Sequence, residues 1–171
     1  MGDAPTAARP VLLVTGGSRG IGAAIAHMAA PRYDVVVNYT SHAVAANAVV
    51  ADVRAAGSQA IAVRADVADE SAVVAMFAEI DEHFGRLDVL VNNAGIAGGY
   101  GTLDIVTSEM LQRLWAVNVT GAFVCAREAA HRMRTDRGGT GGSIINISSK
   151  AAVLGGSTEW VHYAASKGAL D

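Results

Sequence analysis

Five short apolar runs alternate with longer stretches of helical character along the 171-residue chain, and this alternation restricts the fold more than any other feature. The runs are rich in β-branched residues and show little polar–apolar alternation, as expected of strands covered on both faces. We predict strands at Val11–Thr15, Val35–Tyr39, Ala60–Asp66, Leu87–Asn93 and Ser143–Ser148. Repeated strand–helix–strand units at this spacing predict an α/β fold with a doubly wound, Rossmann-type parallel sheet.

The stretches between these runs predict four helices and the beginning of a fifth. The predicted helices cover Gly20–Ala30, Ala43–Ala56, Glu70–Phe84, Ser108–Arg134 and a segment that starts near Val161. We expect Asp69 or Asp66 to cap the third helix and Ser108 to cap the fourth. Gly57 and Gly85 lie where the second and third helices are expected to end.

The expected organisation is a flexible tail at residues 1–10 and one Rossmann-type domain at residues 11–171. Gly138–Gly142 is predicted to be the turn that leads into the fifth strand. The last helix has room for barely three turns before Asp171, which would leave the apolar fifth strand as an unpaired edge. We therefore expect the sheet to be truncated at its C-terminal side.

The composition excludes several classes of function. With 51% hydrophobic and 17% charged residues, the chain is too apolar to be disordered. Its formal charge of -3 provides no basic surface for nucleic acid. No run approaches the roughly 18 apolar residues of a membrane-spanning helix, and no histidine or cysteine cluster has the spacing of metal ligands. The single Cys125 and the absence of a secretory pattern predict a cytoplasmic protein.

The segment Thr15–Gly22, TGGSRGIG, follows the first predicted strand and fits two kinds of site. Read as G-x-S-x-G, it would place Ser18 on the nucleophile elbow of an esterase. Read as a glycine-rich turn, Gly16, Gly20 and Gly22 would let the backbone approach a dinucleotide pyrophosphate at a helix N-terminus. No histidine stands out as a partner for Ser18, and the first strand offers little sheet for an elbow. The pattern therefore favours the dinucleotide.

Four further motifs follow in order along the chain. They are the NNAG motif at 92–95, Asn118 in the long helix, Ser149 after the fifth strand, and the YAASK motif at 163–167. With TGGSRGIG, they make the chain resemble the short-chain dehydrogenase/reductases, especially 3-oxoacyl-carrier-protein reductases and sugar (glucose) dehydrogenases. The resemblance runs from about Pro10 to Asp171. It implies an enzyme that interconverts a carbonyl and a secondary alcohol with a nicotinamide cofactor.

The spacing of Tyr163 and Lys167 places both side chains on one face of a helix. A lysine ammonium about 4 Å from a phenolate stabilises it by on the order of 4 kcal/mol at an effective dielectric near 20. The resemblance implies that Tyr163 is the general acid/base and that Lys167 also holds the nicotinamide ribose. It further implies that Ser149, rather than the adjacent Ser148, hydrogen-bonds the reacting oxygen, and that Asn118 holds a water of a proton relay.

The end of the second predicted strand indicates the cofactor. NAD-specific sites usually carry an acid there, whereas residues 38–42 contain none and Asp34 lies at the opposite end. Arg19 would pair with a 2′-phosphate, so we predict NADP(H), with NAD(H) as the alternative. The resemblance implies that Asp66 binds the adenine amine and that Asn92 braces a neighbouring strand. The predicted cofactor-binding residues are Gly16, Ser18, Arg19, Gly20, Ile21, Gly22, Asn38, Tyr39, Thr40, Asp66, Val67, Asn92, Ala94, Gly95, Tyr163 and Lys167.

Three functions remain open from the sequence. The first is an NADP(H)-preferring oxidoreductase, and the second is an NAD-dependent sugar or alcohol dehydrogenase. The third is a nucleotide-binding or scaffolding protein without turnover because of truncation. The substrate, a small molecule, would contact Ile96–Leu103 and Val153–His162, where Trp160 is either a substrate wall or a packing residue. The resemblance implies a homodimer or homotetramer, and no nucleic-acid, membrane or metal partner is expected.

Overall fold

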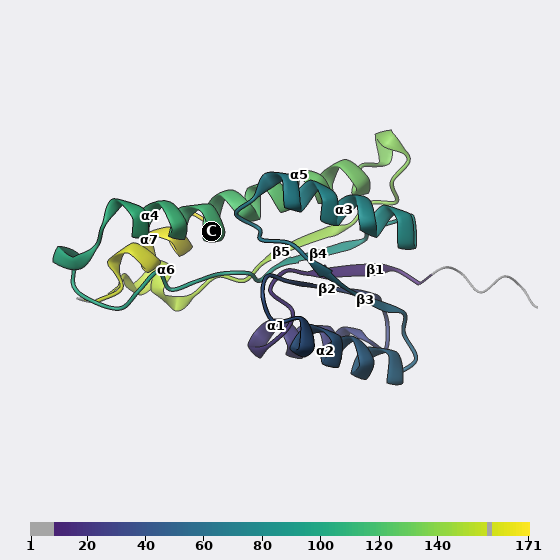
Figure 1. Cartoon of the computed structure of the whole chain (residues 1–171). Helices are drawn as coiled ribbons and strands as arrows, with labels where there is room; N and C mark the ends of the chain where they lie inside the picture. Colours follow the sequence, from purple (N-terminus) through teal and green to yellow (C-terminus); the bar gives the residue numbers. More distant parts are fainter. Residues whose placement is uncertain (1–8, 157–158) are drawn as a thin grey trace, which may run out of the picture.

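A five-stranded parallel sheet with helices on both faces forms the centre of the computed structural model (Figure 1). The strand order is β3-β2-β1-β4-β5, which confirms the α/β prediction. The strands are β1 (Val11–Val14), β2 (Asp34–Tyr39), β3 (Ala60–Arg64), β4 (Val89–Asn92) and β5 (Ser143–Asn146). The structure describes residues 9–156 and 159–171. Residues 1–8 of the predicted tail and 157–158 of the predicted substrate segment lie outside the described residues.

Helices cover both faces of the sheet. In Figure 1, α1 and α2 lie on one face, and α3 and α5 lie on the other. The helices are α1 (Gly20–Ala29), α2 (Ala43–Ala55), α3 (Glu70–Phe84), α4 (Ser108–Trp115), α5 (Gly121–Met133), α6 (Lys150–Leu154) and α7 (Val161–Gly168). Among the helices that the structure describes, none is long and apolar enough to cross a membrane.

Alternate residues of β1 enter two separate hydrophobic cores. Leu13 is fully buried in one core with Phe77 of α3. Val14 lies in the other core with Val53 of α2. Burial of each such side chain contributes about 1.5–3 kcal/mol to folding. Burial on both faces explains why this strand reads as a continuous apolar run.

The ends of the helices follow their capping residues. The Asp69 carboxylate accepts hydrogen bonds from the backbone N–H groups of Ser71 and Ala72, at 2.9 and 3.2 Å, so Asp69 and not Asp66 caps α3. Gly85 ends α3 with a φ of 66°, where the lack of a Cβ avoids strain. The prediction that Ser108 caps the fourth helix is wrong, because Thr107 is the capping residue and Ser108 is already helical.

The predicted single helix Ser108–Arg134 is divided into α4 and α5 by a π-helical turn at Ala116–Thr120. At the start of α5, a Cβ on Gly121 would lie 2.6 Å from the carbonyl oxygen of Val67. The turn therefore brings backbone against backbone at this point. Turns of this kind occur frequently at functional sites. The short helix α6 is not among the predicted helices.

Two residues assigned to the predicted tail contact the edge of the domain. Arg9 donates hydrogen bonds to the Ala30 carbonyl at 2.7 Å and to the Ser58 hydroxyl at 2.9 Å. It also lies 3.4 Å from the carboxylate of Asp34, whose backbone N–H donates to the carbonyl of Pro10. The assignment of residues 9 and 10 to a flexible tail is therefore corrected. Asp34 serves this packing and lies far from the carboxyl end of β2.

The fifth strand is an edge of the described sheet. All four of its residues are exposed, including Ile144 at 40% and Ile145 at 47%. Parallel strands in a complete α/β sheet normally read as buried on both faces. The apolar side chains of β5 are therefore not buried by the part of the chain that the structure describes.

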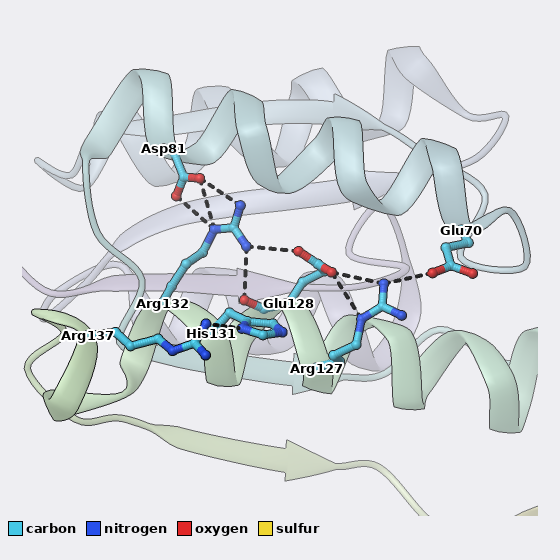
Figure 2. Close-up of polar contacts among 7 residues, drawn as sticks. All are labelled: Glu70, Asp81, Arg127, Glu128, His131, Arg132 and Arg137. Carbon is cyan, nitrogen blue, oxygen red and sulfur yellow. Dashed lines mark hydrogen bonds and ion pairs between the residues drawn. The ribbon is translucent and has the colours of Figure 1, made fainter.

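Five side chains form an ionic network between α3 and α5 (Figure 2). Arg132 donates to Asp81 at 2.7 Å and to Glu128 at 3.1 Å. Arg127 lies 2.8 Å from Glu70 and 2.9 Å from Glu128. The Glu128 side chain is only 14% exposed, so this carboxylate links two arginines on the shielded side of the helix pair.

We expect Glu128→Gln to lower the free energy of unfolding by about 1–3 kcal/mol at neutral pH. Burial alone would raise the pKa of Glu128, but hydrogen bonds from Arg127 and Arg132 outweigh it and hold the pKa below its usual value. The stabilisation is therefore present above the unfolded-state pKa and is lost as pH falls through the lowered folded-state pKa. Urea denaturation at neutral pH and at the lowest pH that preserves the fold measures both effects.

The matched control is Glu79→Gln, which removes an exposed carboxylate from α3. Its effect on the free energy of unfolding should stay within about 0.5 kcal/mol. Equal losses for the two variants would show that the network contributes no specific stability.

Candidate active site

The turn between β1 and α1 requires glycine at several positions. Gly16 and Gly20 have φ angles of 62° and 56°, which other residues rarely adopt. A Cβ on Gly22 would lie 2.5 Å from the carbonyl oxygen of Gly16 and 2.6 Å from the amide nitrogen of Asn93. The backbone is therefore exposed at the N-terminus of α1, where N–H groups can bind an anion.

Residues directly after β4 hold this turn in place. The Asn93 side chain donates to the carbonyls of Thr15 at 2.8 Å and Gly16 at 3.2 Å. The Thr15 hydroxyl accepts from the backbone N–H groups of Asn93 and Ala94, both at 3.0 Å. We did not predict Asn93 as a site residue, although it belongs to the NNAG motif. Its polar side chain directly after a buried strand was the available signal.

Two predicted cofactor-binding residues instead hold neighbouring segments of the protein together. The buried Asn38 accepts a hydrogen bond from the Gly16 N–H at 3.1 Å and donates to the Ala65 carbonyl at 3.0 Å. Asn92 donates to the Asn146 side chain of β5 and to the Ala122 carbonyl, both at 3.1 Å. Neither residue lines the cleft described below, because both side chains already hold neighbouring segments together.

A cleft of about 440 Å³ lies at the carboxyl ends of the strands, where the strand order reverses between β1 and β4. Such reversals are the usual binding place in open α/β sheets. The predicted residues that line it are Gly16, Ser18, Arg19, Gly20, Ile21, Gly22, Tyr39, Thr40, Asp66, Val67, Ala94 and Gly95. Ser41, His42, Asn93, Ile96, Arg113 and Val117 also line it.

The charged side chains of the cleft are unevenly paired. Asp66 lies 2.8 Å from the Arg113 guanidinium of α4, and its other carboxylate oxygen accepts from the Ala68 N–H at 3.0 Å. The exposed Arg19 guanidinium lies 3.4 Å from the His42 imidazole at the carboxyl end of β2. The carboxylate of Asp66 is thus neutralised, whereas Arg19 and His42 face the cleft without an acid in residues 38–42.

Lys167 is almost fully buried on α7, and its ammonium donates to the Ile147 carbonyl at 2.7 Å. The same nitrogen lies 6.0 Å from the centre of the Tyr163 ring. Burial lowers the pKa of Lys167, and the negative charge of Asp171 opposes this shift in part. A Cβ on Gly95, which lines the cleft, would lie 3.6 Å from the Lys167 nitrogen. The ammonium therefore lies next to the cleft.

Ser149 lies just beyond β5 and caps α6, since its hydroxyl oxygen accepts from the Ala151 N–H at 3.1 Å. This contact uses a lone pair and leaves the hydroxyl proton available for another acceptor. The Ser148 hydroxyl is buried and has no hydrogen-bond partner among the described residues. The two serines thus occupy different environments, as the strand alternation predicts.

Asn118 lies in the π-helical turn and connects it to two other elements. Its side chain accepts from the Ile96 N–H at 2.8 Å and donates to the Ile96 carbonyl at 2.9 Å. It also donates to the Ser166 hydroxyl at 2.9 Å, and Ser166 donates to the Tyr163 carbonyl at 2.8 Å. Asn118 therefore fixes the helix that carries Tyr163 and Lys167 relative to the cleft.

The residues present fit a nicotinamide dinucleotide. The turn at residues 16–22 offers bare backbone for a pyrophosphate, and the buried Lys167 ammonium lies next to the cleft, 6.0 Å from the centre of the Tyr163 ring. A family model described as short chain dehydrogenase matches residues 10–171. The chain belongs to the short-chain dehydrogenase family.

Individual short-chain dehydrogenases agree with this assignment. An uncharacterized oxidoreductase of Escherichia coli is 49% identical and is matched over 94% of this chain and 66% of its own length. A Burkholderia cenocepacia short chain dehydrogenase in complex with NADP is 41% identical, with a TM-score of 0.87 over 95% of this chain and 64% of its own. An NAD+-bound xylitol dehydrogenase is 31% identical, with a TM-score of 0.86 over 96% and 62%.

The chain spans less than two thirds of the length of these short-chain dehydrogenases. The matched segment covers 66% of the Escherichia coli relative and 62–64% of the two solved structures. The shared part contains the sheet, the cleft and the YAASK motif on α7.

Proposed function

We propose that the protein is an NADP(H)-preferring oxidoreductase that interconverts a carbonyl and a secondary alcohol. The observation that carries this proposal is the position of the buried Lys167 ammonium. It lies beside Gly95 at the cleft and 6.0 Å from the centre of the Tyr163 ring. A cation placed this way stabilises a phenolate, and a phenol that can lose and regain its proton serves as a general acid/base.

Four residues of the chain have separate roles in the proposed reaction. A nicotinamide bound in the cleft supplies or accepts the hydride. Tyr163 donates a proton to the carbonyl oxygen during reduction and takes it back during oxidation. Ser149, whose oxygen already accepts from the Ala151 N–H, keeps its proton and donates a hydrogen bond from its hydroxyl to the same carbonyl oxygen as negative charge develops there. Asn118 and Ser166 position the helix that carries Tyr163.

The preference for NADP(H) rests on the adenosine end of the cleft. An NAD-specific site would place a carboxylate there to bind the ribose hydroxyls, whereas Arg19 and His42 lie there instead. The NADP complex from Burkholderia cenocepacia is also more similar in sequence than the NAD+-bound xylitol dehydrogenase. Both observations support a site for the 2′-phosphate.

We expect Arg19→Ala to weaken NADPH binding by about tenfold and to leave NADH binding unchanged. The guanidinium would contact only the extra phosphate of NADPH. Fluorescence titration of the purified protein with each cofactor gives both dissociation constants. Arg32→Ala is the control, because Arg32 is exposed beyond α1 and does not line the cleft. Equal losses for both cofactors, or tighter binding of NADH by the unaltered protein, would contradict the preference.

We further propose that the protein works in the cytoplasm as a homodimer or homotetramer built on α5 and α7. Phe123 on α5 is 66% exposed and Val161 on α7 is 42% exposed, which is unfavourable for apolar side chains in water. Light scattering should give twice or four times the monomer mass, and a monomer would contradict this assembly.

A further inference from the structure

A second pocket lies beside the proposed catalytic side chains. It has a volume of about 400 Å³, within the roughly 300–1,000 Å³ range of small-molecule sites. Its lining residues are Tyr100, Ala151, Gly155, Gly156, Glu159 and Trp160. The lining combines two large aromatic rings with small residues that leave the space open.

This pocket borders both groups that would handle the carbonyl oxygen. The ring of Trp160 meets the ring of Tyr163 edge to face, with centroids 5.5 Å apart. On another side, the N–H of Ala151 donates to the hydroxyl oxygen of Ser149. A ketone whose oxygen lies between Tyr163 and Ser149 would therefore place its remaining atoms against this pocket.

Three aromatic rings form a continuous row at the pocket. Tyr100 meets Trp160 edge to face at 5.7 Å, in the same geometry as the Trp160–Tyr163 pair. Tyr100 is 65% exposed, so aromatic surface remains for a ligand. A flat aromatic ligand would bury apolar area and form further favourable ring pairs in this row.

The pocket lining carries one charged group, the carboxylate of Glu159. A hydrogen bond with Glu159 raises the pKa of Tyr100. The Glu159 carbonyl also accepts from the Gly101 N–H at 3.3 Å. The carboxylate in the lining would repel an anion, so the pocket favours a ligand without negative charge.

The loop that carries Tyr100 is held to α7 in advance. The His162 ring is 4% exposed and lies 3.3 Å from the Gly99 carbonyl. A Cβ on Gly98 would lie 3.0 Å from Leu114 and 3.3 Å from His162, so the loop packs closely on both. A wall fixed before binding loses less entropy when the ligand arrives.

We propose that this pocket binds the ring portion of a flat, uncharged aromatic ketone and holds its carbonyl oxygen at Tyr163 and Ser149. The proposal rests on the proposed function and specifies its substrate class. A polyol or an open-chain sugar would leave most of its hydroxyl groups without partners in an aromatic lining and would bind poorly there.

The chain's two tryptophans permit a binding assay independent of turnover. In a Trp115→Phe variant, Trp160 is the single tryptophan and reports on the pocket directly. With NADP+ present, we expect 2-tetralone to quench its fluorescence saturably, with a dissociation constant at least about tenfold below that of cyclohexanone or xylulose. Equal dissociation constants, or no saturable quenching by 2-tetralone, would overturn the proposal.

Two substitutions at Trp160 test whether binding needs an aromatic ring at this position. By calorimetry, Trp160→Phe should bind 2-tetralone within about threefold of the unaltered protein, whereas Trp160→Leu should bind it about tenfold more weakly. Binding of cyclohexanone and of NADPH should stay the same in both variants, which shows that the fold is kept. A Leu variant that keeps its preference for 2-tetralone contradicts the proposal. Saturable 2-tetralone binding without NADPH oxidation would instead refute only the proposed function.

Discussion

Replacing Tyr163 by phenylalanine is expected to lower kcat for NADPH-dependent ketone reduction by about 10²–10⁴-fold. The substitution removes one hydroxyl group and keeps the ring that packs edge to face against Trp160 at 5.5 Å. The loss therefore measures proton transfer and not packing. NADPH absorbance gives the rate, and a fluorescence titration gives the dissociation constant of NADPH, which should stay unchanged.

Tyr33→Phe is the matched control for this substitution. Tyr33 is half-buried next to the amino end of β2. The cleft lies at the carboxyl ends of the strands, so the Tyr33 hydroxyl takes no part in the reaction. Its kcat should equal that of the unaltered protein. If Tyr163→Phe kept turnover within about threefold of that protein, Tyr163 would not be the general acid/base.

Replacing Gly22 by valine is expected to abolish dinucleotide binding, with at least about a hundredfold increase in the dissociation constant for NADPH. A Cβ at this position would lie 2.5 Å from the Gly16 carbonyl oxygen and 2.6 Å from the Asn93 amide nitrogen. These two atoms form the hydrogen bond that holds the turn. The turn must therefore move to admit the side chain. Fluorescence titration with NADPH measures the loss.

Two further variants separate this local effect from a general loss of structure. Gly22→Ala should weaken NADPH binding less than valine, because it adds only the Cβ. Ala24→Val places the same larger side chain at an exposed position of α1 and should leave binding unchanged. If Gly22→Val bound NADPH as well as Ala24→Val did, the turn at residues 16–22 would not be the pyrophosphate site.

The strands and helices α1, α2 and α3 could be predicted because their signals are local. Helix α3 has the predicted bounds, Glu70–Phe84, since a capping aspartate precedes it and a glycine with positive φ ends it. Strands β1 and β4 read as apolar runs because the sheet buries both of their faces. Their predicted carboxyl ends extend one residue too far, to Thr15 and Asn93, whose side chains bond each other's backbone next to the glycine turn.

Features set by distant neighbours could not be predicted. The π-helical turn at Ala116–Thr120 reflects the close approach of Gly121 to the Val67 backbone, which the local helical pattern does not encode. The pairing of Asp66 with Arg113 joins residues 47 positions apart. Helix α6 is only five residues long, too short to leave a periodic pattern.

The candidate site shows the same division. The order of the motifs predicted which segments converge on the cleft, and the spacing of the YAASK motif predicted a shared helix face. The resemblance led us to expect that Asn92 braces a neighbouring strand, as its bond to Asn146 of β5 confirms, but the sequence did not reveal that Asn38 holds the Gly16 backbone or that Asn93 secures the glycine turn. An asparagine after a buried strand reads the same whether its amide faces a ligand or a neighbouring carbonyl.

A crystal structure of the protein with NADP+ tests the central claim most directly. The account predicts the pyrophosphate over the backbone of residues 16–22, the 2′-phosphate beside Arg19, and the nicotinamide next to Tyr163 and Lys167. A dinucleotide bound elsewhere, or a Tyr163 hydroxyl directed away from the nicotinamide, would contradict it.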